Sequence, residues 1–267
     1  PSGPGGNPPV NPLRPGDPTL FETRTEYNED SLKIRIVHPE GDEVVMVYDE
    51  ANPNPRARGN MLSRTYLPGP RGSVDQPGGR TETFEYDDGF GAGGCCGTNF
   101  VKRHVDFRRN ETLHDYDAQG NKIHTQHRIA SIEEDCEYNA FGQKTRYIHP
   151  DNDGHRRVDD YVFYGPEGGH QEGHLFQSIE DVGGFELTTT FEYDEVGNIV
   201  RVIDPMGNDS LVTYNERNQV VRTQSAAVAT LQSGGSVRYE TSTSYDENDN
   251  IVQVSTANID ETGALRP

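Results

Sequence analysis

The sequence predicts an all-β protein made of repeated antiparallel β-hairpins, arranged as a continuous β-spiral or solenoid. Residues 191–222 show the local pattern, because apolar and β-branched runs alternate with short clusters of Asp, Gly, Asn and Pro. The pattern also recurs, since Thr- or Glu-rich segments lead into tyrosines 27, 86, 138, 193 and 245, at intervals of 59, 52, 55 and 52 residues. Repeats of this length are typical of solenoids, propellers and similar arrays. A closed sandwich with coincidental tyrosine spacing is the alternative.

The turns expected within this stretch have distinct chemical signatures. Asp194-Glu195-Val196-Gly197 ends on Gly, which can adopt the left-handed conformation that closes a type I turn with a bulge. Asp204-Pro205-Met206-Gly207 adds a proline that sets φ at the second turn position, as does His38-Pro39-Glu40-Gly41. In Asn215-Glu216-Arg217-Asn218 an asparagine takes the place of the glycine, and Asn tolerates that conformation best after Gly. We therefore expect a β-meander of short strands.

A tyrosine precedes several of these turns, in the pattern Tyr-(Asp/Asn)-x-x-(Gly/Asn/Asp). Five copies of this pattern make it a repeat. They are Tyr116-Asp117-Ala118-Gln119-Gly120, Tyr138-Asn139-Ala140-Phe141-Gly142, Tyr193-Asp194-Glu195-Val196-Gly197, Tyr214-Asn215-Glu216-Arg217-Asn218 and Tyr245-Asp246-Glu247-Asn248-Asp249.

The two ends of the chain are in phase with the repeat. The segment from Leu13 to Tyr27 aligns without a gap on the segment from Leu231 to Tyr245, and Leu13-Arg14-Pro15 reappears as Leu265-Arg266-Pro267. We therefore expect a Pro/Gly-rich linker over residues 1–20, a repeat array over 21–256, and a linker to a next module over 257–267. The chain would then be an interior segment of a longer array.

The composition indicates a thin core and an acidic surface. Hydrophobic residues make up 31% of the chain and Trp is absent, whereas compact domains usually contain about 45–50% apolar residues. A single layer held by cross-strand pairs suits this composition. Disorder is the alternative for so polar a chain, but the regular turns and 13 Tyr argue against it over residues 21–256. A net charge of −20 disfavours nucleic acid and anionic membranes as partners, and no apolar run is long enough to span a membrane.

Long Pro/Gly-rich loops interrupt the pattern at residues 68–79, 165–174 and 226–236. Such loops are unusual inside compact domains and often carry function. We expect them to protrude from one rim of the array and to form its binding or assembly surface.

The cysteines leave several possibilities open. Cys95 and Cys96 are adjacent within a glycine-rich segment at 87–98, and Cys136 is the third cysteine of the chain. A disulfide from one of the pair to Cys136, a bond between the two neighbours, thiolate ligation of a metal and free thiols are all compatible with the sequence. The odd number also allows a link to another chain.

No cofactor or metal site is expected, although calcium remains an alternative. Eight of the nine histidines lie between His104 and His174, but His170 and His174 sit in a glycine-rich loop that cannot present both on one helical face. Residues 151–154 and 246–250 resemble fragments of calcium loops without the downstream Glu. A Gly-x-Ser-x-Gly or His-Glu-x-x-His motif is absent from the sequence, so we expect no enzyme.

The segments Tyr193-Asp194-x-x-Gly197-Asn198-Ile199 and Asp204-Pro205-x-Gly207-Asn208, with the four other tyrosine copies, resemble the YD repeats of Rhs-type proteins. Relatives of this kind include bacterial polymorphic toxins, wall-associated proteins, the encapsulating component of insecticidal toxin complexes, and teneurins. The resemblance implies a spiral of β-hairpins, often wound into a hollow shell, that is secreted or on the cell surface. Two features depart from it: the Asp-Pro-rich self-cleaving region has no counterpart, and long inserts lengthen several repeats.

These observations lead to an expected function of architectural type. We expect a non-catalytic structural segment of an extracellular or cell-surface YD-repeat protein, which pairs with further YD repeats or identical subunits and could build a fibre or wall. One alternative is the wall of an Rhs-type toxin-encapsulating shell. A second is an adhesion module that binds glycan or a cell-surface protein through loops 68–79 and 165–174.

Overall fold

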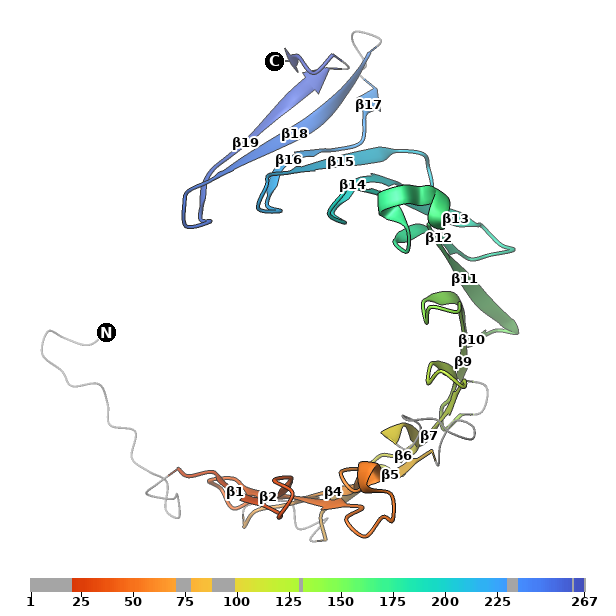
Figure 1. Cartoon of the computed structure of the whole chain (residues 1–267), viewed down its shortest axis with the longest axis vertical. Helices are drawn as coiled ribbons and strands as arrows, with labels where there is room; N and C mark the ends of the chain where they lie inside the picture. Colours follow the sequence, from red (N-terminus) through yellow and green to blue (C-terminus); the bar gives the residue numbers. More distant parts are fainter. Residues whose placement is uncertain are drawn as a thin grey trace, which may run out of the picture. The chain divides into compact units, whose positions relative to one another are not determined.

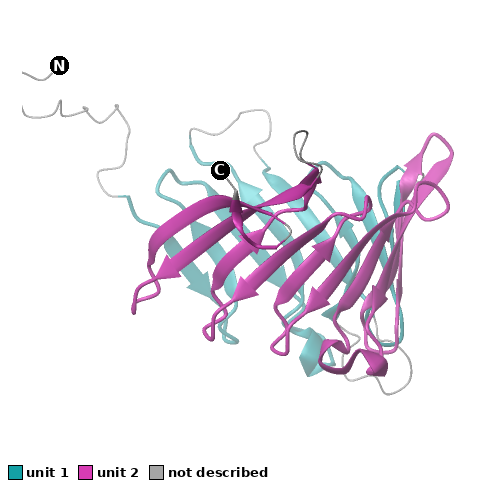
Figure 2. Ribbon diagram, turned by 90° about the horizontal axis from the view of Figure 1, so that it is seen from above, with its two compact units in different colours: residues 1–133 teal, residues 134–267 magenta. Residues whose placement is uncertain are grey.

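The computed structural model describes residues 21–70, 78–87, 99–129, 132–229, 235–260 and 262–266. These residues form the strands β1–β20 and two short 3-10 helices, η1 and η3, so the all-β prediction is confirmed. The chain divides into two compact units, residues 1–133 and 134–267 (Figure 2). The predicted linker at 1–20 lies outside the described residues.

Unit 1 is an antiparallel meander in which each strand pairs with the next along the chain, from β1 to β8 (Figure 1). Its elements are β1 (Arg24–Tyr27), β2 (Lys33–Val37), β3 (Glu43–Tyr48), η1 (Pro55–Ala57), β4 (Met61–Leu67), β5 (Arg80–Tyr86), β6 (Val101–Val105), β7 (Glu111–Tyr116) and β8 (Lys122–Gln126).

Unit 2 follows the same plan, except that β16 and the two-residue strand β17 both pair directly with β18. Its first strand begins on the last residue of unit 1. The elements are β9 (Glu133–Tyr138), β10 (Lys144–Asn152), β11 (His155–Phe163), η3 (Pro166–Gln171), β12 (Leu175–Glu180), β13 (Leu187–Tyr193), β14 (Ile199–Ile203), β15 (Asp209–Tyr214), β16 (Val220–Gln224), β17 (Val228–Ala229), β18 (Ser236–Tyr245), β19 (Ile251–Asp260) and β20 (Leu265–Arg266).

One five-residue turn recurs ten times in the described part of the chain. The N–H of its first residue donates to the carbonyl of the fifth, and the N–H of its fourth residue donates to the carbonyl of the first. The fourth residue always has positive φ. The copies span residues 28–32, 38–42, 106–110, 117–121, 139–143, 194–198, 204–208, 215–219, 246–250 and 260–264.

This geometry confirms the predicted type I turn with a bulge. The fourth position is Gly197 at φ 89° and Gly207 at φ 82°. Asn218 occupies the same position at φ 60°, as expected for the copy in which asparagine replaces glycine. At these positions the residue itself favours the turn, because left-handed backbone is accessible mainly to Gly and Asn. Ser31, Arg109 and Asp249 adopt the same positive φ in other copies, so the residue type alone does not set every turn.

A meander changes edge after every strand, so each unit has two rims with different chemistry. We call the first the tyrosine rim, because strands end there on a tyrosine or just before one. In unit 1 these residues are Tyr27, Tyr48, Tyr86 and Tyr116, and in unit 2 they are Tyr138, Tyr164, Tyr193, Tyr214 and Tyr245. The opposite rim carries the turns at 38–42 and 106–110 in unit 1, and at 204–208 and 260–264 in unit 2.

The expectation that the long loops share one rim is wrong, because successive connections of a meander lie at opposite rims. Within unit 2, the 165–174 loop leaves the tyrosine rim, whereas the connection over 226–236 lies at the opposite rim between β16 and β18. In unit 1, the 68–79 connection joins β4 to β5 at the opposite rim. The number of strands between two inserts decides the rim, and the pattern of Pro and Gly carries no information on that number.

Each unit packs through neighbouring strands, and few apolar side chains are strongly sheltered. Among the described residues these are Met46, Ala57 and Ile259, at 8%, 3% and 4% exposure. The predicted thin core is confirmed. The strand pattern also continues past residue 256, where the array was expected to end, because β19 pairs with the ten-residue β18 as far as Asp260. Within the described ranges, no helix has the length and apolar character to cross a membrane.

Candidate functional site: the tyrosine rim

The tyrosines of this rim tie neighbouring strands together through their hydroxyl groups. Tyr116, the last residue of β7, donates from Oη to the carbonyl oxygen of Val101, the first residue of β6, over 2.8 Å. We call this contact the hydroxyl link, and it recurs along the rim. Further copies join Tyr48 to Lys33 (3.0 Å), Tyr86 to Met61 (3.0 Å), Tyr214 to Ile199 (3.1 Å) and Tyr245 to Val220 (2.9 Å).

A β-bulge accompanies these tyrosines. The strand register shifts between Asp115 and Tyr116, and again between Thr213 and Tyr214. Bulges of this kind re-aim a side chain relative to the regular pleat. Burial raises the pKa of the Tyr86 and Tyr116 hydroxyls above the usual value, so both remain protonated donors at neutral pH.

The aspartate after the tyrosine closes the turn. In Asp117, Oδ1 accepts the N–H groups of Gln119 and Asn121 at 2.9 Å each, and Oδ2 accepts from Asn121 Nδ2 at 2.9 Å. The same set of contacts is made by Asp106, Asp194, Asp204 and Asp246, each with the Asn four residues later. In the copies at 139–143 and 215–219, an Asn–Gln pair replaces the Asp–Asn pair.

These contacts keep the turn carboxylates ionised. The side-chain hydrogen bond from Asn198, together with backbone N–H donors, lowers the pKa of Asp194, and the Asn208 amide does the same for Asp204. Asp246, one of the residues that suggested a calcium loop, has its pKa lowered by Asn250 in the same way. Its carboxylate oxygens are engaged in turn closure, which accounts for the Asp- and Asn-rich sequence there.

The predicted turn residues therefore lie where the motif suggested, each within its own turn. The predicted set of repeat turns omitted two tyrosines that form this link. Tyr48-Asp49-Glu50-Ala51-Asn52 does fit the sequence pattern, whereas Tyr86 is followed by Phe90 at the position where Gly, Asn or Asp is expected. Long loops replace the short turn in both cases, yet the Asp49 N–H still donates to Asn60 O (2.9 Å) and the Asp87 N–H to Phe100 O (2.8 Å). The Tyr-Asp dipeptide by itself was the signal that could have identified them.

The insert over residues 164–174 folds over the Tyr193 turn. Tyr164 Oη donates to Phe191 O (2.9 Å), and Gln171 Oε1 accepts the N–H of Tyr193 (2.8 Å). His170 Nε2 donates to Tyr193 O over 3.0 Å, and the His174 ring lies 4.6 Å from the Tyr193 ring. The two histidines thus position this turn. Within the described ranges, no group of three or more His, Cys, Asp and Glu side chains is arranged to hold a metal ion.

Arginine residues link carboxylates across three strands in a second repeated pattern. Arg201 on β14 contacts Glu192 on β13 (3.0 Å) and Asp209 on β15 (3.2 Å). Such solvent-screened ion pairs add little to stability individually, and each arginine joins side chains of three neighbouring strands. Arg35 with Glu26 and Glu43, Arg103 with Glu85 and Glu111, and Arg146 with Glu137 and Asp160 repeat the arrangement.

Of the disulfide candidates, only Cys136 falls within the described residues. It lies half-buried on β9 opposite Tyr147 and carries a free thiol in this structure. Burial, followed by the hydrogen bond with Glu134, raises the pKa of Tyr147 to about 12. Cys95 and Cys96 lie outside the described residues, and their pairing stays a prediction.

Comparison with known proteins finds similarity in structure. No protein-family model matches the sequence, and no curated protein matches it. The TcdB2–TccC3–Cdc42 crystal structure aligns over 90% of this chain at 14% identity with a TM-score of 0.46, and the Photorhabdus luminescens Tc holotoxin pore with a substituted TccC3 aligns over 90% at 15% identity with a TM-score of 0.44. This chain spans 15% of the length of each of those chains. A porin-like protein from Bacteroides uniformis aligns over 90% of this chain and 95% of its own, at 12% identity and a TM-score of 0.25.

Proposed function

We propose that this chain is a non-catalytic segment of the wall of a YD-repeat shell of the Rhs type. The observation that carries the proposal is the hydroxyl link, which recurs with the five-residue turn in both units. Together these two features reproduce the Tyr-Asp-x-x-Gly-Asn pattern that resembles the YD repeat.

A wall one sheet thick needs stabilisation that does not depend on a deep core. The backbone ladder holds neighbouring strands within each unit, and the hydroxyl link adds a side-chain contact at the end of strand pairs such as β6–β7 and β14–β15. Each link contributes about 0.5–1.5 kcal/mol, and repetition multiplies this contribution along the array. The Arg–carboxylate contacts act across the same strands, away from the rim.

The partners of such a segment would be further YD repeats of the same protein, at the cell surface or in a secreted particle. The role is mechanical separation of an interior from the surroundings, which requires a continuous sheet and no reacting group. A surface fibre built from the same hairpins is the second candidate, favoured by the repetitive pairing of each strand with its neighbours.

Electron microscopy of the native particle formed by the protein that contains this segment distinguishes the two. Closed hollow particles support the shell, whereas filaments with an axial repeat commensurate with the modules contradict it and support the fibre. A combined Tyr116→Phe, Tyr214→Phe and Tyr245→Phe variant tests the role of the links, with Tyr27→Phe as the matched control. The triple variant should give fragmented or protease-sensitive particles, and intact protease-resistant particles would contradict the role given to the links.

A further inference from the structure

Strands β1 and β19 each leave one side unpaired within the described part of the chain. In unit 1, β1 pairs with β2, and all four of its residues are exposed. In unit 2, β19 pairs with β18 along its length, whereas the short strand β20 covers only the last part of its other side (Figure 1). Ile251, Val252 and Val254 of β19 are 60%, 61% and 57% exposed. Unpaired sheet edges of this kind favour the addition of another strand.

The hydroxyl links follow a rule that shows what each of these edges lacks. The acceptor carbonyl of a link belongs to the residue that stands opposite the preceding tyrosine in the strand ladder. Ile199 stands opposite Tyr193 and accepts from Tyr214, and Val220 stands opposite Tyr214 and accepts from Tyr245. The series Tyr27–Lys33–Tyr48, Tyr48–Met61–Tyr86 and Tyr86–Val101–Tyr116 repeat this order in unit 1. One strand pair therefore provides the acceptor for the next tyrosine along the chain.

This order leaves a donor on β1 and an acceptor on β19 without a counterpart among the described residues. The hydroxyl of Tyr27, the last residue of β1, forms no hydrogen bond there, and its side chain is 55% exposed. Ile251, the first residue of β19, stands opposite Tyr245 and so occupies the acceptor position. No tyrosine hydroxyl of the described residues reaches its carbonyl oxygen. A link from Tyr27 to Ile251 would satisfy both groups.

The register of such a pair follows from the existing pairs. The residue two positions after an acceptor stands opposite the residue three positions before the linked tyrosine, as Arg222 stands opposite Ser242. The pairs Arg35–Val45, Ser63–Thr83, Arg103–Leu113 and Arg201–Leu211 have the same offset. Applied to Ile251 and Tyr27, this offset places Gln253 opposite Arg24 and Val254 opposite Thr23.

The sequence of β1 supports this assignment. The segment from Leu13 to Tyr27 aligns without a gap on the segment from Leu231 to Tyr245, so β1 corresponds to the last four residues of β18. Those residues of β18 pair with β19 on one side, and Ser242 pairs with β16 on the other. The strand β1 therefore has the sequence of a strand that pairs on both sides.

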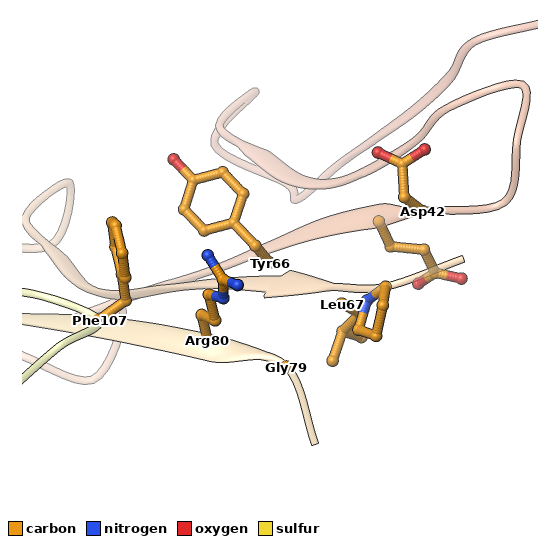
Figure 3. A pocket seen from close by; sticks show the side chains of 8 residues that line it. Asp42, Tyr66, Leu67, Gly79, Arg80 and Phe107 are labelled. Atoms are coloured by element: carbon orange, nitrogen blue, oxygen red, sulfur yellow. The ribbon is translucent and has the colours of Figure 1, made fainter. Parts of the chain in front are cut away.

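The cavity at the opposite rim of unit 1 does not specify a partner in this way. It has a volume of about 390 Å³, and Tyr66, Arg80 and Phe107 line it together with the carboxylates of Asp42 and Glu43 (Figure 3). The Arg80 guanidinium lies 5.8 Å from the Phe107 ring centre. Because both signs of charge line this cavity, its charge selects no ligand. The two strand edges instead define a partner through backbone register.

We propose that β19 of one copy of this chain pairs, antiparallel, with β1 of a second copy, and that Tyr27 of the second copy donates its hydroxyl to the carbonyl oxygen of Ile251. The contact continues the meander from one copy into the next by strand addition. Because β1 and β19 are different surfaces, the contact is heterologous, and each copy can bind a further copy at either edge. The inference rests on the proposed function, because it gives the hydroxyl link of the repeat a partner strand of defined register.

Sedimentation velocity of the full chain over a wide concentration range tests whether the copies associate. The wild type should form dimers and longer species as concentration rises. Val254→Lys places a charge on the pairing strand and should shift this association about tenfold to higher concentration. Tyr27→Phe removes one link and leaves the backbone ladder, so its shift should be smaller, about threefold.

Val196→Lys is the matched control for Val254→Lys, because Val196 is 70% exposed on the turn at 194–198. It should leave the association unchanged. A wild type that stays monomeric, or an equal shift in the two lysine variants, would overturn the proposal. Circular dichroism of each variant confirms that its strands are retained.

Disulfide trapping tests the register. In a background with the three native cysteines changed to serine, a mixture of a Thr23→Cys chain and a Val254→Cys chain should form a mixed disulfide on mild oxidation, because the two residues stand opposite each other. Arg24→Cys mixed with Val254→Cys is the control, because successive side chains of a strand point to opposite faces of the sheet. Equal cross-linking in the two mixtures would contradict the register.

The inference and the proposed function fail on different results. If the copies do not associate but Tyr214→Phe still lowers the free energy of unfolding, the pairing between copies is wrong and the role of the link within each unit stands. If Tyr214→Phe leaves unfolding unchanged, the proposed function loses its principal support. Urea unfolding at a concentration where the chain is monomeric keeps the two results separate.

Discussion

Two consecutive turns in unit 2 share one backbone geometry and differ in their surroundings. The turns at 194–198 and 204–208 flank β14, and each closes with a 2.9 Å bond from the first N–H to the fifth carbonyl. Yet a Cβ added at Gly197 would lie 2.9 Å from His174 Nε2, whereas one added at Gly207 would meet nothing within 4 Å. The comparison shows that local residues build the turn, and that distant residues decide what else the position can hold.

The two rims also share the turn geometry and differ in the contacts made around it. At the tyrosine rim, the residue before the turn at 215–219 is Tyr214, which reaches the neighbouring strand through its hydroxyl link. At the opposite rim, the residue before the turn at 204–208 is Ile203, which has no hydroxyl to donate. The same turn geometry therefore only connects two strands at the opposite rim, whereas at the tyrosine rim the preceding tyrosine also binds the neighbouring strand.

The largest difference in stability between the two rims is expected when Gly197 and Gly207 are each replaced by alanine. Gly197→Ala and Gly207→Ala each place a Cβ in the left-handed region, which costs roughly 1–2 kcal/mol. Gly197→Ala must also displace the His174 ring, which packs on Tyr193, so its loss of unfolding free energy in urea should exceed that of Gly207→Ala by about 1 kcal/mol. Adding His174→Ala should remove the excess, and equal losses in the two single variants would refute the role of the insert.

Loss of one hydroxyl link is expected to have the next largest effect. Tyr214→Phe removes the donor to Ile199 O and should lower the free energy of unfolding by about 0.5–1.5 kcal/mol. Tyr27→Phe is the matched control, because the Tyr27 hydroxyl forms no hydrogen bond among the described residues. Urea unfolding of the two variants measures the difference. If the two variants lose the same free energy of unfolding, the hydroxyl link of Tyr214 does not contribute to stability.

A smaller effect on stability is expected when Asp194 and Asp204 are protonated, and it should be similar at the two rims. The pKa of Asp194 and of Asp204 is lowered by the same kind of donors. Their contribution to stability is therefore present above the ordinary Asp pKa of about 3.9 and is lost as pH falls through the lower pKa of the folded state. Carboxyl NMR titration should place both below 3.9. An ordinary pKa at Asp204 alone would break the equivalence of the turns.

The smallest effect is expected where asparagine replaces glycine. Asn218 adopts φ 60°, and its Oδ1 accepts from Asn198 Nδ2 over 3.0 Å, which joins two neighbouring turns of the tyrosine rim. Asn218→Gly relieves backbone strain but loses this exposed contact and gains unfolded-state entropy, so the free energy of unfolding should change by less than about 0.5 kcal/mol. A loss well above this in thermal or urea unfolding would show that the lateral contact is a principal stabiliser of the rim.

The strands and most of the turns could be predicted from the sequence, because both depend on residues close together in the chain. Gly197, Gly207 and Asn218 predicted their own left-handed geometry, since few residues adopt it. The tyrosine pattern predicted a strand end at Tyr116 for the same local reason. The alternation of apolar and polar residues likewise predicts strands from neighbouring residues alone.

Tertiary structure alone decided which distant groups meet. The hydroxyl of Tyr86 reaches Met61, 25 residues away, across a loop whose length no turn signature records. The 165–174 insert packs His174 against Gly197, and the long loops fall on different rims because strand number sets their position. Such contacts depend on the pairing of whole strands, which short-range preferences cannot specify.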